Sequence, residues 1–533
     1  MSPLQAAPRQ AGAPNANFRR SSSSLIIRYL PVVACAYFAV ATFLIALARI
    51  PFVDEGTFAG SALNIVRTGF TGNPSTPPWG LGIPLVESQK YNFWVMPGYL
   101  YTLAGWYRLF PQTIMSARVL SVIFGVGCII LFYFYVRLLS RSMELATLAC
   151  CLLALDFTMA YRSAVARMDS MSVFVNLAAW VLYLVLRERR FYLAIFISTL
   201  TGMLSLLIHP NGLFALAGVA VLAVLLDRHR LQLRCLVPAA AGVVIPLSLY
   251  ALVISQAPEV WHSQVQAHSV GRFLGFVHPF HSIKTEFLRR YYDAFGGIEQ
   301  GMRFYHGSRA RLILLAVLAT YFASVLFALL KSSIRRSLIG KASLAIFGIT
   351  VIYFTFFETG KPDVYNIHVM PWFCLFFALA ASDLFRHKHW RNLAVAIVFF
   401  VALINLAGTI YYARVNQRYA LDYRPVLKLF REEMGPRDVV LTHAYFGLDL
   451  GFDRVTEDFT MVDIVRRHPK FVTLDQWFTI GGVTKTWPYG PDPASVGMIS
   501  PQEKKEAMQL LRSKYRIVLE NRDYIVYERV RPF

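Results

Sequence analysis

Charged residues and cysteines are both scarce in this chain of 533 residues. Charged residues make up 16% of it, whereas hydrophobic residues make up 56%. So apolar a composition excludes an ordinary soluble domain of this length and predicts an integral membrane protein. The six cysteines lie in or at the ends of apolar segments, so they offer neither a disulfide framework nor a metal-binding spacing.

Apolar segments long enough to cross about 30 Å of hydrocarbon recur along the chain. We expect eleven of them to span the membrane as helices. They are 29–48, 119–136, 145–161, 171–186, 191–208, 211–226, 235–254, 312–330, 343–357, 367–385 and 393–412. A further apolar segment, 93–110, is interrupted by Pro97, Gly98, Gly105 and Arg108, and we expect it to lie on the outer surface as a juxtamembrane helix.

Basic residues between the spans set the orientation. With 93–110 outside, the basic clusters at 137–141, 187–190, 228–234, 331–336 and 386–391 all face the cytoplasm, as short basic loops do. The N-terminus is then inside and the C-terminus outside. Inner loops and anionic lipid headgroups account for the formal net charge of +22, so no nucleic-acid partner is needed.

Three parts of the chain follow from this topology. Residues 1–24 are predicted to be a disordered cytoplasmic tail and 25–412 a transmembrane domain, with large outer loops at 49–117 and 255–308. Residues 413–533 predict a small outer α/β domain, with strands at 438–441, 470–474, 515–520 and 524–528 and a hairpin turn at 521–523. This tail has no glycine-rich phosphate loop and no nucleophile motif, and no solenoid repeat is visible.

Two adjacent carboxylates, Asp54 and Glu55, follow the first span. Residues 55–67 have the spacing of a short amphipathic helix lying in the membrane interface with its apolar side down. In one interpretation Asp54 is the N-cap and Glu55 interacts with the helix dipole. In the other, the two carboxylates lie in a sheltered pocket beside 93–110, where one can act as a general base.

A second outer turn, between the third and fourth spans, carries Arg167 and Asp169 in the sequence A-Y-R-S-A-V-A-R-M-D-S-M. One interpretation is a salt bridge at the interface, or Asp169 as a cap of the fourth span. Together with Asp54, however, the turn places two carboxylates and a guanidinium at one membrane face. These groups suit an attacking hydroxyl and a phosphate leaving group.

These stretches resemble a family, the GT-C glycosyltransferases, in the bacterial branch related to protein O-mannosyltransferases and lipid A aminoarabinose transferases. The similarity lies in V-D-E-G-T-F-A-G-S-A, P-G-Y-L-Y-T-L-A-G-W-Y-R-L-F-P, S-A-R-V-L-S-V-I-F-G-V-G and the turn around Arg167. K-P-D-V-Y-N-I-H-V-M-P-W-F, at 361–373, is similar to a later outer turn of the family that carries a lysine and a tyrosine.

The resemblance implies a hexosyl or pentosyl transferase that moves a sugar from a polyprenyl-phosphate donor to a glycan, lipid or protein acceptor, with inversion. Asp54 matches the family's catalytic acidic position, Glu55 its neighbour and Asp169 the second acidic position. We expect Arg167, Lys90, Arg272, Lys361 and Tyr365 to bind the donor phosphate. The expected location is a bacterial inner membrane with the site facing the periplasm, and the alternative is the endoplasmic reticulum.

A divalent metal stays open as a cofactor. Some relatives carry Glu-Lys immediately before the proline of the surface helix, whereas Trp94, Val95 and Met96 precede Pro97 in this chain. The remaining candidate ligands are Glu87, His209 and His268, whose spacing fits no tight ligand motif.

Two other classes of function compete with the transferase hypothesis. A secondary transporter would explain the many spans, with Asp156 and Asp383 as ion sites, but its two related halves are not visible in the sequence. A membrane anchor for the C-terminal domain would leave the acidic first outer loop unexplained.

Overall fold

The computed structural model describes residues 23–269, 274–295, 308–358, 360–475 and 497–530, and helices dominate these ranges. Within them, nine helical segments are long and apolar enough to cross a membrane. The main helices of these segments are α1 (Ser23–Ala48), α4 (Ile114–Ser140), α7 (Met168–Leu186), α8 (Phe191–Ile208), α9 (Leu213–Asp227), α10 (Leu236–Ile254), α13 (Ser308–Leu330), α15 (Leu338–Phe356) and α17 (Lys388–Val415).

The other two expected spans are also helical but irregular. α5 (Met143–Leu155) and α6 (Phe157–Ser163) form one segment bent by 61°. Asp156 lies at the bend and accepts a hydrogen bond from the Met159 amide at 2.7 Å, so it caps α6. α16 (Met370–Phe385) has only 16 residues. The polytopic helical fold is therefore confirmed, although at most ten segments of the described chain pass as full spans.

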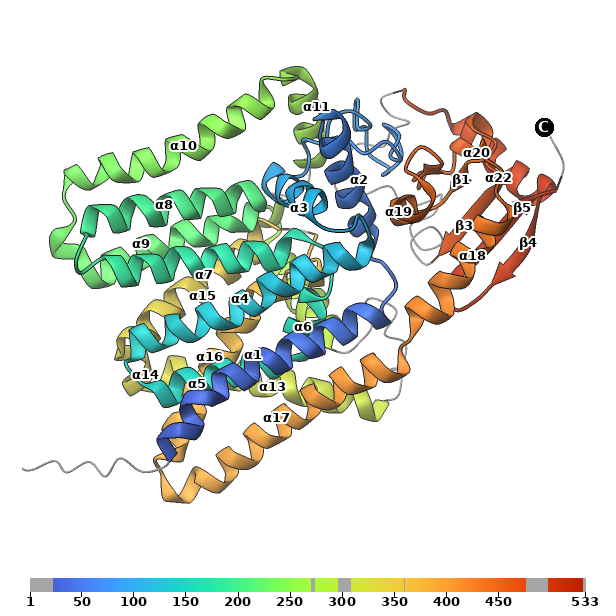
Figure 1. Cartoon of the computed structure of the whole chain (residues 1–533). Helices are drawn as coiled ribbons and strands as arrows, with labels where there is room; N and C mark the ends of the chain where they lie inside the picture. Colours follow the sequence, from blue (N-terminus) through green and yellow to red (C-terminus); the bar gives the residue numbers. More distant parts are fainter. Residues whose placement is uncertain (1–22, 270–273, 296–307, 359, 476–496, 531–533) are drawn as a thin grey trace, which may run out of the picture.

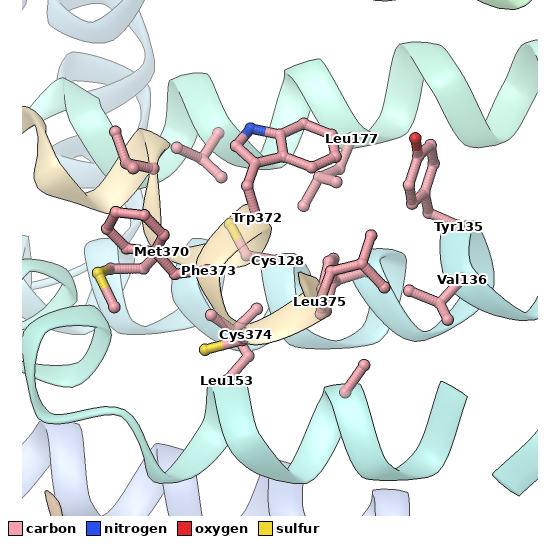
Figure 2. Packing of buried hydrophobic residues seen from close by; sticks show 14 of the residues in the cluster. Cys128, Tyr135, Val136, Leu153, Leu177, Met370, Trp372, Phe373, Cys374 and Leu375 are labelled. Carbon is pink, nitrogen blue, oxygen red and sulfur yellow. The ribbon is translucent and has the colours of Figure 1, made fainter. Parts of the chain in front are cut away.

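α16 forms the centre of the helical core. Every residue from Met370 to Ala381 is buried, and Figure 2 shows Trp372 beside Leu177 of α7 and Cys374 beside Leu153 of α5. The ring of Trp372 also lies 5.9 Å from that of Tyr135 in α4. A helix enclosed by protein on all sides does not need the full thickness of a bilayer, which explains how so short an apolar helix is accommodated.

The first outer loop and the C-terminal unit lie at the same end of the bundle. Figure 1 shows α2 (Val53–Thr68), α3 (Pro97–Leu109) and the C-terminal sheet together, whereas α14 (Ser332–Arg336) and the turns between α7 and α8 and between α9 and α10 lie at the opposite end. Those opposite turns contain the basic clusters. The arrangement therefore agrees with the orientation predicted from charge.

α2 differs from the sequence-based expectation, because it is buried in protein and does not lie in a membrane interface. Its residues from Glu55 to Leu63 are all buried. A Cβ on Gly56 would come within 2.0 Å of the Tyr445 backbone nitrogen, and one on Gly60 within 2.4 Å of the Asn73 side chain. Small residues on α2 therefore let the C-terminal unit approach on one side while α3 covers another.

The C-terminal unit contains a mixed five-stranded sheet in the order β2-β1-β3-β5-β4. The strands are β1 (Val440–Leu441), β2 (Val455–Thr456), β3 (Phe471–Asp475), β4 (Tyr515–Glu520) and β5 (Tyr524–Arg529). β1 pairs in parallel with β2 and β3, and β5 pairs antiparallel with β3 and β4. The predicted hairpin around 521–523 is present, whereas the two-residue strand β2 was not predicted.

The remaining elements connect these parts. They are η1 (Pro210–Gly212), η2 (Arg228–Arg230), η3 (Leu233–Cys235), α11 (Pro258–Ser269), η4 (Leu274–Phe276), α12 (Pro279–Thr285), η5 (Glu286–Asp293), η7 (Asp363–His368), η8 (Tyr419–Tyr423), α18 (Arg424–Glu433), η9 (Ala444–Phe446), α19 (Gly447–Leu450), α20 (Asp463–Arg466) and α22 (Pro501–Lys514).

A buried ionic cluster joins the C-terminal unit to the first outer loop. The His443 imidazole lies 2.6 Å from Asp475 and 3.5 Å from Glu457. Glu457 in turn accepts hydrogen bonds from the hydroxyls of Thr57 at 3.3 Å and Thr76 at 3.4 Å. Burial lowers the pKa of His443, but the two carboxylates outweigh burial and raise the pKa to about 9. The cluster therefore holds a charged imidazolium at neutral pH.

We expect this cluster to make the stability of the protein depend on pH. The folded-state pKa of His443, about 9, lies above the ordinary value of 6.5, so its stabilisation is fully present below pH 6.5 and is lost as pH rises through 9. The difference corresponds to roughly 3 kcal/mol. Thermal unfolding of the purified protein between pH 7 and 10 should show this loss in the wild type and not in H443Q.

Two features make the measurement specific. Asp458 is also buried, with a pKa raised to about 7, so its ionisation lowers the stability of the fold as pH rises from its ordinary value of 3.8 to about 7, below most of the range measured. A control variant, H387Q, changes a histidine with 55% of its side chain exposed and should retain the wild-type profile. Equal loss of stability in H443Q and the wild type would contradict the prediction.

Candidate active site

The outer turns of the sequence converge on a small cavity at the end of the bundle that faces the C-terminal unit. Its volume is about 220 Å³. It is lined by Phe52, Arg162, Val165, Arg167, Asp169 and Val364. These residues come from the start of the first outer loop, from the turn between α6 and α7 and from η7, so three distant segments build one site.

Arg167 connects two of the three predicted catalytic carboxylates. As the N-cap of α7, it forms an ion pair with Asp54 and donates from Nε to Asp169 at 2.7 Å. The Asp54 side chain is 31% exposed, whereas only 4% of Asp169 is exposed. The predicted group of two carboxylates and one guanidinium therefore forms, with Asp54 as its accessible member.

The interpretation of Asp54 as a helix cap is wrong. α2 begins at Val53, and its N-cap is Phe52. The Glu55 carboxylate performs the capping, because it accepts a hydrogen bond from the Phe52 amide at 2.6 Å. Asp54 is consequently available for the contact with Arg167.

Glu55 lies behind the cavity in a buried ion pair with Arg118, and neither side chain has any exposed surface. Arg118 donates from Nε at 2.9 Å and from Nη2 at 2.8 Å. The Ala166 amide also donates to Glu55, at 2.7 Å. Burial alone would raise the pKa of Glu55, but the charge and hydrogen bonds of Arg118 hold it below the ordinary value. Glu55 thus ties α2 to α4 and to the turn that carries Arg167.

Arg162 and Asp363 form a second buried ion pair, which the sequence analysis did not identify. Arg162 lies on α6, and Asp363 begins η7. The Nε and Nη1 atoms of Arg162 are buried and have no hydrogen-bond partner. Arg162 stands five residues before Arg167 in the same motif, but the sequence gives no signal for its partner 201 positions away.

The predicted phosphate ligands Lys361 and Tyr365 do not line the cavity. Lys361 is 1% exposed and donates to the carbonyl oxygens of Phe354 at 2.6 Å and Thr355 at 2.5 Å. It also lies 3.3 Å from Glu286, and burial lowers its pKa despite that carboxylate. Lys361 therefore holds the turn before η7 in place.

Tyr365 and its histidine neighbours lie behind Asp169. The Tyr365 ring stacks on Phe354 at 5.9 Å and contacts His209 edge-on at 5.0 Å. His368 is buried nearby, and burial lowers its pKa to about 4 although Asp169 opposes that shift. His368 is therefore neutral at physiological pH and adds no positive charge beside Asp169.

A second, more apolar cavity lies deeper in the bundle. Its volume is about 290 Å³. It is lined by Val173, Asn176, Leu177, Trp180, Phe214, Thr350, His368, Pro371 and Trp372. It contains no carboxylate, and its titratable side chain is that of His368.

Lys90 lies away from the cavity. Lys90 is exposed, and its ammonium group lies over the rings of Phe70 at 4.9 Å and Tyr91 at 5.1 Å. Arg272 lies outside the described residues. Of the five predicted phosphate ligands, only Arg167 lines the 220 Å³ cavity in the described part of the chain.

The predicted metal ligands do not come together either. Glu87 is exposed, His209 accepts a hydrogen bond from the Asn211 amide at 3.0 Å, and His268 packs against Trp94 at 5.0 Å. Across the ranges that the structure describes, no group of three or more histidine, cysteine, aspartate or glutamate residues could hold a metal ion. No step below is therefore assigned to a metal.

Comparison with known proteins agrees with this architecture. The family model of the dolichyl-phosphate-mannose-protein mannosyltransferases matches residues 35–256, which include Asp54, Arg162, Arg167 and Asp169. No curated protein matches the chain in sequence.

Two solved structures are similar in fold. The crystal structure of ArnT from Cupriavidus metallidurans bound to undecaprenyl phosphate has a TM-score of 0.55 at 11% identity, over 95% of this chain and 98% of that one. The oligosaccharyltransferase of Archaeoglobus fulgidus, in complex with zinc and sulfate, has a TM-score of 0.51 at 14% identity, over 86% of this chain and 70% of that one. The chain therefore has the fold of these two membrane glycosyltransferases, and its residues 35–256 match the protein mannosyltransferase model, in agreement with the resemblance noted in the sequence.

Proposed function

We propose that this protein transfers a sugar from a polyprenyl-phosphate-linked donor to a hydroxyl acceptor, with Asp54 as the general base. The observation that carries the proposal is the position of Asp54. Of the three predicted catalytic carboxylates, it has by far the largest exposed fraction, and it forms an ion pair with Arg167, which lines the cavity. The mannosyltransferase family match and the undecaprenyl phosphate in the ArnT structure support the donor class.

The proposed reaction is a single displacement. The acceptor oxygen forms a bond to the anomeric carbon while the bond from that carbon to the phosphate oxygen breaks, and the phosphate leaves with the electron pair. Asp54 takes the proton of the acceptor hydroxyl. Because attack and departure occur on opposite faces, the configuration at the anomeric carbon inverts.

Arg167 and Asp169 act as positioning residues in this proposal. The guanidinium of Arg167 holds Asp54 on one side and Asp169 on the other, which fixes the direction of the base. Asp169 is 4% exposed at the cavity wall, where one carboxylate oxygen, Oδ1, has no hydrogen-bond partner. That oxygen can orient a sugar or acceptor hydroxyl.

Glu55 and Lys361 have structural roles in the same proposal. Glu55 has no exposed surface and holds α2 and the Arg167 turn together, so we assign it to positioning and not to proton transfer. Lys361 holds the turn that presents Asp363 and Val364. Lys90, Tyr365 and Arg272 remain predictions as contacts of the donor, and none of the described ones lies at the cavity.

We place the reaction on the periplasmic face of a bacterial inner membrane. The support is the charge asymmetry, since the basic turns lie at the end of the bundle opposite the cavity. The acceptor class stays open among a protein, a lipid and a glycan. Two observations favour the transferase over the transporter hypothesis. Asp156 caps α6 by accepting a hydrogen bond from the Met159 amide, and the similar folds are those of transferases.

The direct test is sugar transfer by the purified wild-type protein in lipid nanodiscs. The donors would be short-chain polyprenyl-phosphate sugars, mannose included, and the acceptors a serine- and threonine-containing peptide, a lipid and a glycan. We expect transfer to one acceptor class, with inverted anomeric configuration in the NMR spectrum of the product. Retained configuration would contradict the single displacement, and no transfer from any donor would contradict the proposed function.

A further inference from the structure

Arg162 has unused hydrogen-bonding capacity at the cavity. Its side chain is 6% exposed, and its Nη2 group forms the ion pair with Asp363. The Nε and Nη1 groups lie on other edges of the same guanidinium, are buried and have no partner in the protein. A buried N–H donor without an acceptor costs free energy. Such donors are therefore unusual unless a ligand supplies the acceptor.

The other cations around the site are already engaged. Arg167 contacts both Asp54 and Asp169. Lys361 contacts two carbonyl oxygens and Glu286. Arg290 pairs with Glu286 at 2.6 Å and donates to the Pro362 carbonyl at 2.8 Å; its Nη2 group is also buried without a partner, but Arg290 does not line the cavity. Of the two arginines that line the cavity, Arg162 has the larger free donor edge.

We infer that Arg162 binds the oxyanion of the donor phosphate, and that Asp363 positions it for this contact. The inference rests on the proposed function and names the phosphate-binding group of that site. A guanidinium offers donors in a planar fork that matches phosphate oxygens. Phe52, Val165 and Val364 form the apolar part of the same wall and exclude water from the contact.

The charges around the site determine how a phosphate can be held there. Arg162 and Arg167 face three carboxylates, Asp54, Asp169 and Asp363, so the ionised cavity has one negative charge in excess. An anionic phosphate is therefore held by directed N–H donors and not by net attraction. When Asp54 takes the acceptor proton, the excess negative charge disappears as the phosphate gains one, which stabilises the departing group.

The contact between Arg162 and Asp363 gives the outer turn at 361–373 a different role from the one that the resemblance implied. The resemblance pointed to Lys361 and Tyr365, but in the structure Asp363 is the residue of this turn that reaches the cavity arginine. Asp363 holds one edge of Arg162 and leaves the other edges directed to the ligand. Asp363 is thus a positioning residue for phosphate binding.

Binding of farnesyl phosphate, a short polyprenyl phosphate, tests the inference without catalysis. Titration calorimetry of the full-length protein in nanodiscs should give a dissociation constant about 10- to 100-fold weaker for R162Q, since a charge-assisted hydrogen-bond pair is lost. R162K keeps the charge but not the fork, so it should fall between R162Q and the wild type. D54N removes one negative charge and should bind farnesyl phosphate more tightly than the wild type.

Control variants separate binding from folding. R431Q replaces an arginine that is 56% exposed on the C-terminal unit and should bind as the wild type does. The double variant R162Q/D363N removes both partners of the buried pair, so no unpaired carboxylate is left to unfold the protein. It should show the same weak binding as R162Q.

The outcomes distinguish failure of the proposed function from failure of the Arg162 assignment. If the wild type neither binds farnesyl phosphate nor transfers sugar, the proposed function fails. If the wild type binds and both R162K and R162Q/D363N bind equally well, the phosphate lies elsewhere and this inference is wrong. Weakened binding in these variants, with R431Q unchanged, supports Arg162 as the phosphate ligand.

Discussion

Replacing Asp54 with asparagine should reduce the turnover number for sugar transfer by about 10²- to 10⁴-fold, the usual contribution of a general base. Asparagine has nearly the same shape and still accepts a hydrogen bond from Arg167, so the geometry of the site should persist. What it lacks is the ability to take the acceptor proton. The loss should therefore appear in kcat, while the KM for the anionic donor should not rise, because D54N removes a negative charge near the phosphate.

The matched control is D453N, because Asp453 is exposed and lies on the C-terminal unit, outside the set of residues that line the cavity. We expect D453N to transfer sugar at the wild-type rate. Full activity in D54N would contradict the assignment of the base, even if the wild type is a transferase. The pH dependence of kcat adds a second readout. The fall of kcat at acidic pH, which reports protonation of the general base, should disappear in D54N.

Replacing Glu55 with alanine should lower the free energy of unfolding by about 3–5 kcal/mol, because it leaves the guanidinium of Arg118 buried without its counter-charge. Arg118 would keep its hydrogen bonds to the carbonyl oxygens of Ala46, Arg49 and Ile50 but lose both contacts to the carboxylate. The Phe52 and Ala166 amides would lose their acceptor as well. Unfolding of the purified protein in mixed micelles measures the effect.

A double-variant cycle identifies the pair as the cause. E55A/R118A should be less destabilised than the sum of the two single variants, because neither partner is left unpaired. The control E188A changes a glutamate that is 72% exposed beside Arg187, and it should change stability by about 0–1 kcal/mol. Equal effects of E55A and E188A would show that the buried pair does not hold α2 in place.

Local sequence pattern determined much of the fold. Hydropathy located the apolar helices of the bundle and the separate helix α3, although at most ten of the eleven expected spans pass as full spans in the described residues, because helix formation depends on residues close together in the chain. Alternating apolar residues around Asn521 located the hairpin of β4 and β5. The same local signals placed Asp54, Arg167 and Asp169 on one face, and the structure brings these three into contact.

Only the tertiary structure assigned distinct positions to chemically similar residues. Adjacent Asp54 and Glu55 look equivalent in the sequence, yet Asp54 is partly exposed and paired with Arg167, whereas Glu55 is buried against Arg118, 63 positions away. Arg162 meets Asp363 across 201 positions, while Lys361 is turned toward backbone carbonyls. Local periodicity determines which segments are helices and which side they emerge on. It contains no information on which distant charges pair. Those pairs depend on how the helices pack, because a buried charge without a partner is unfavourable.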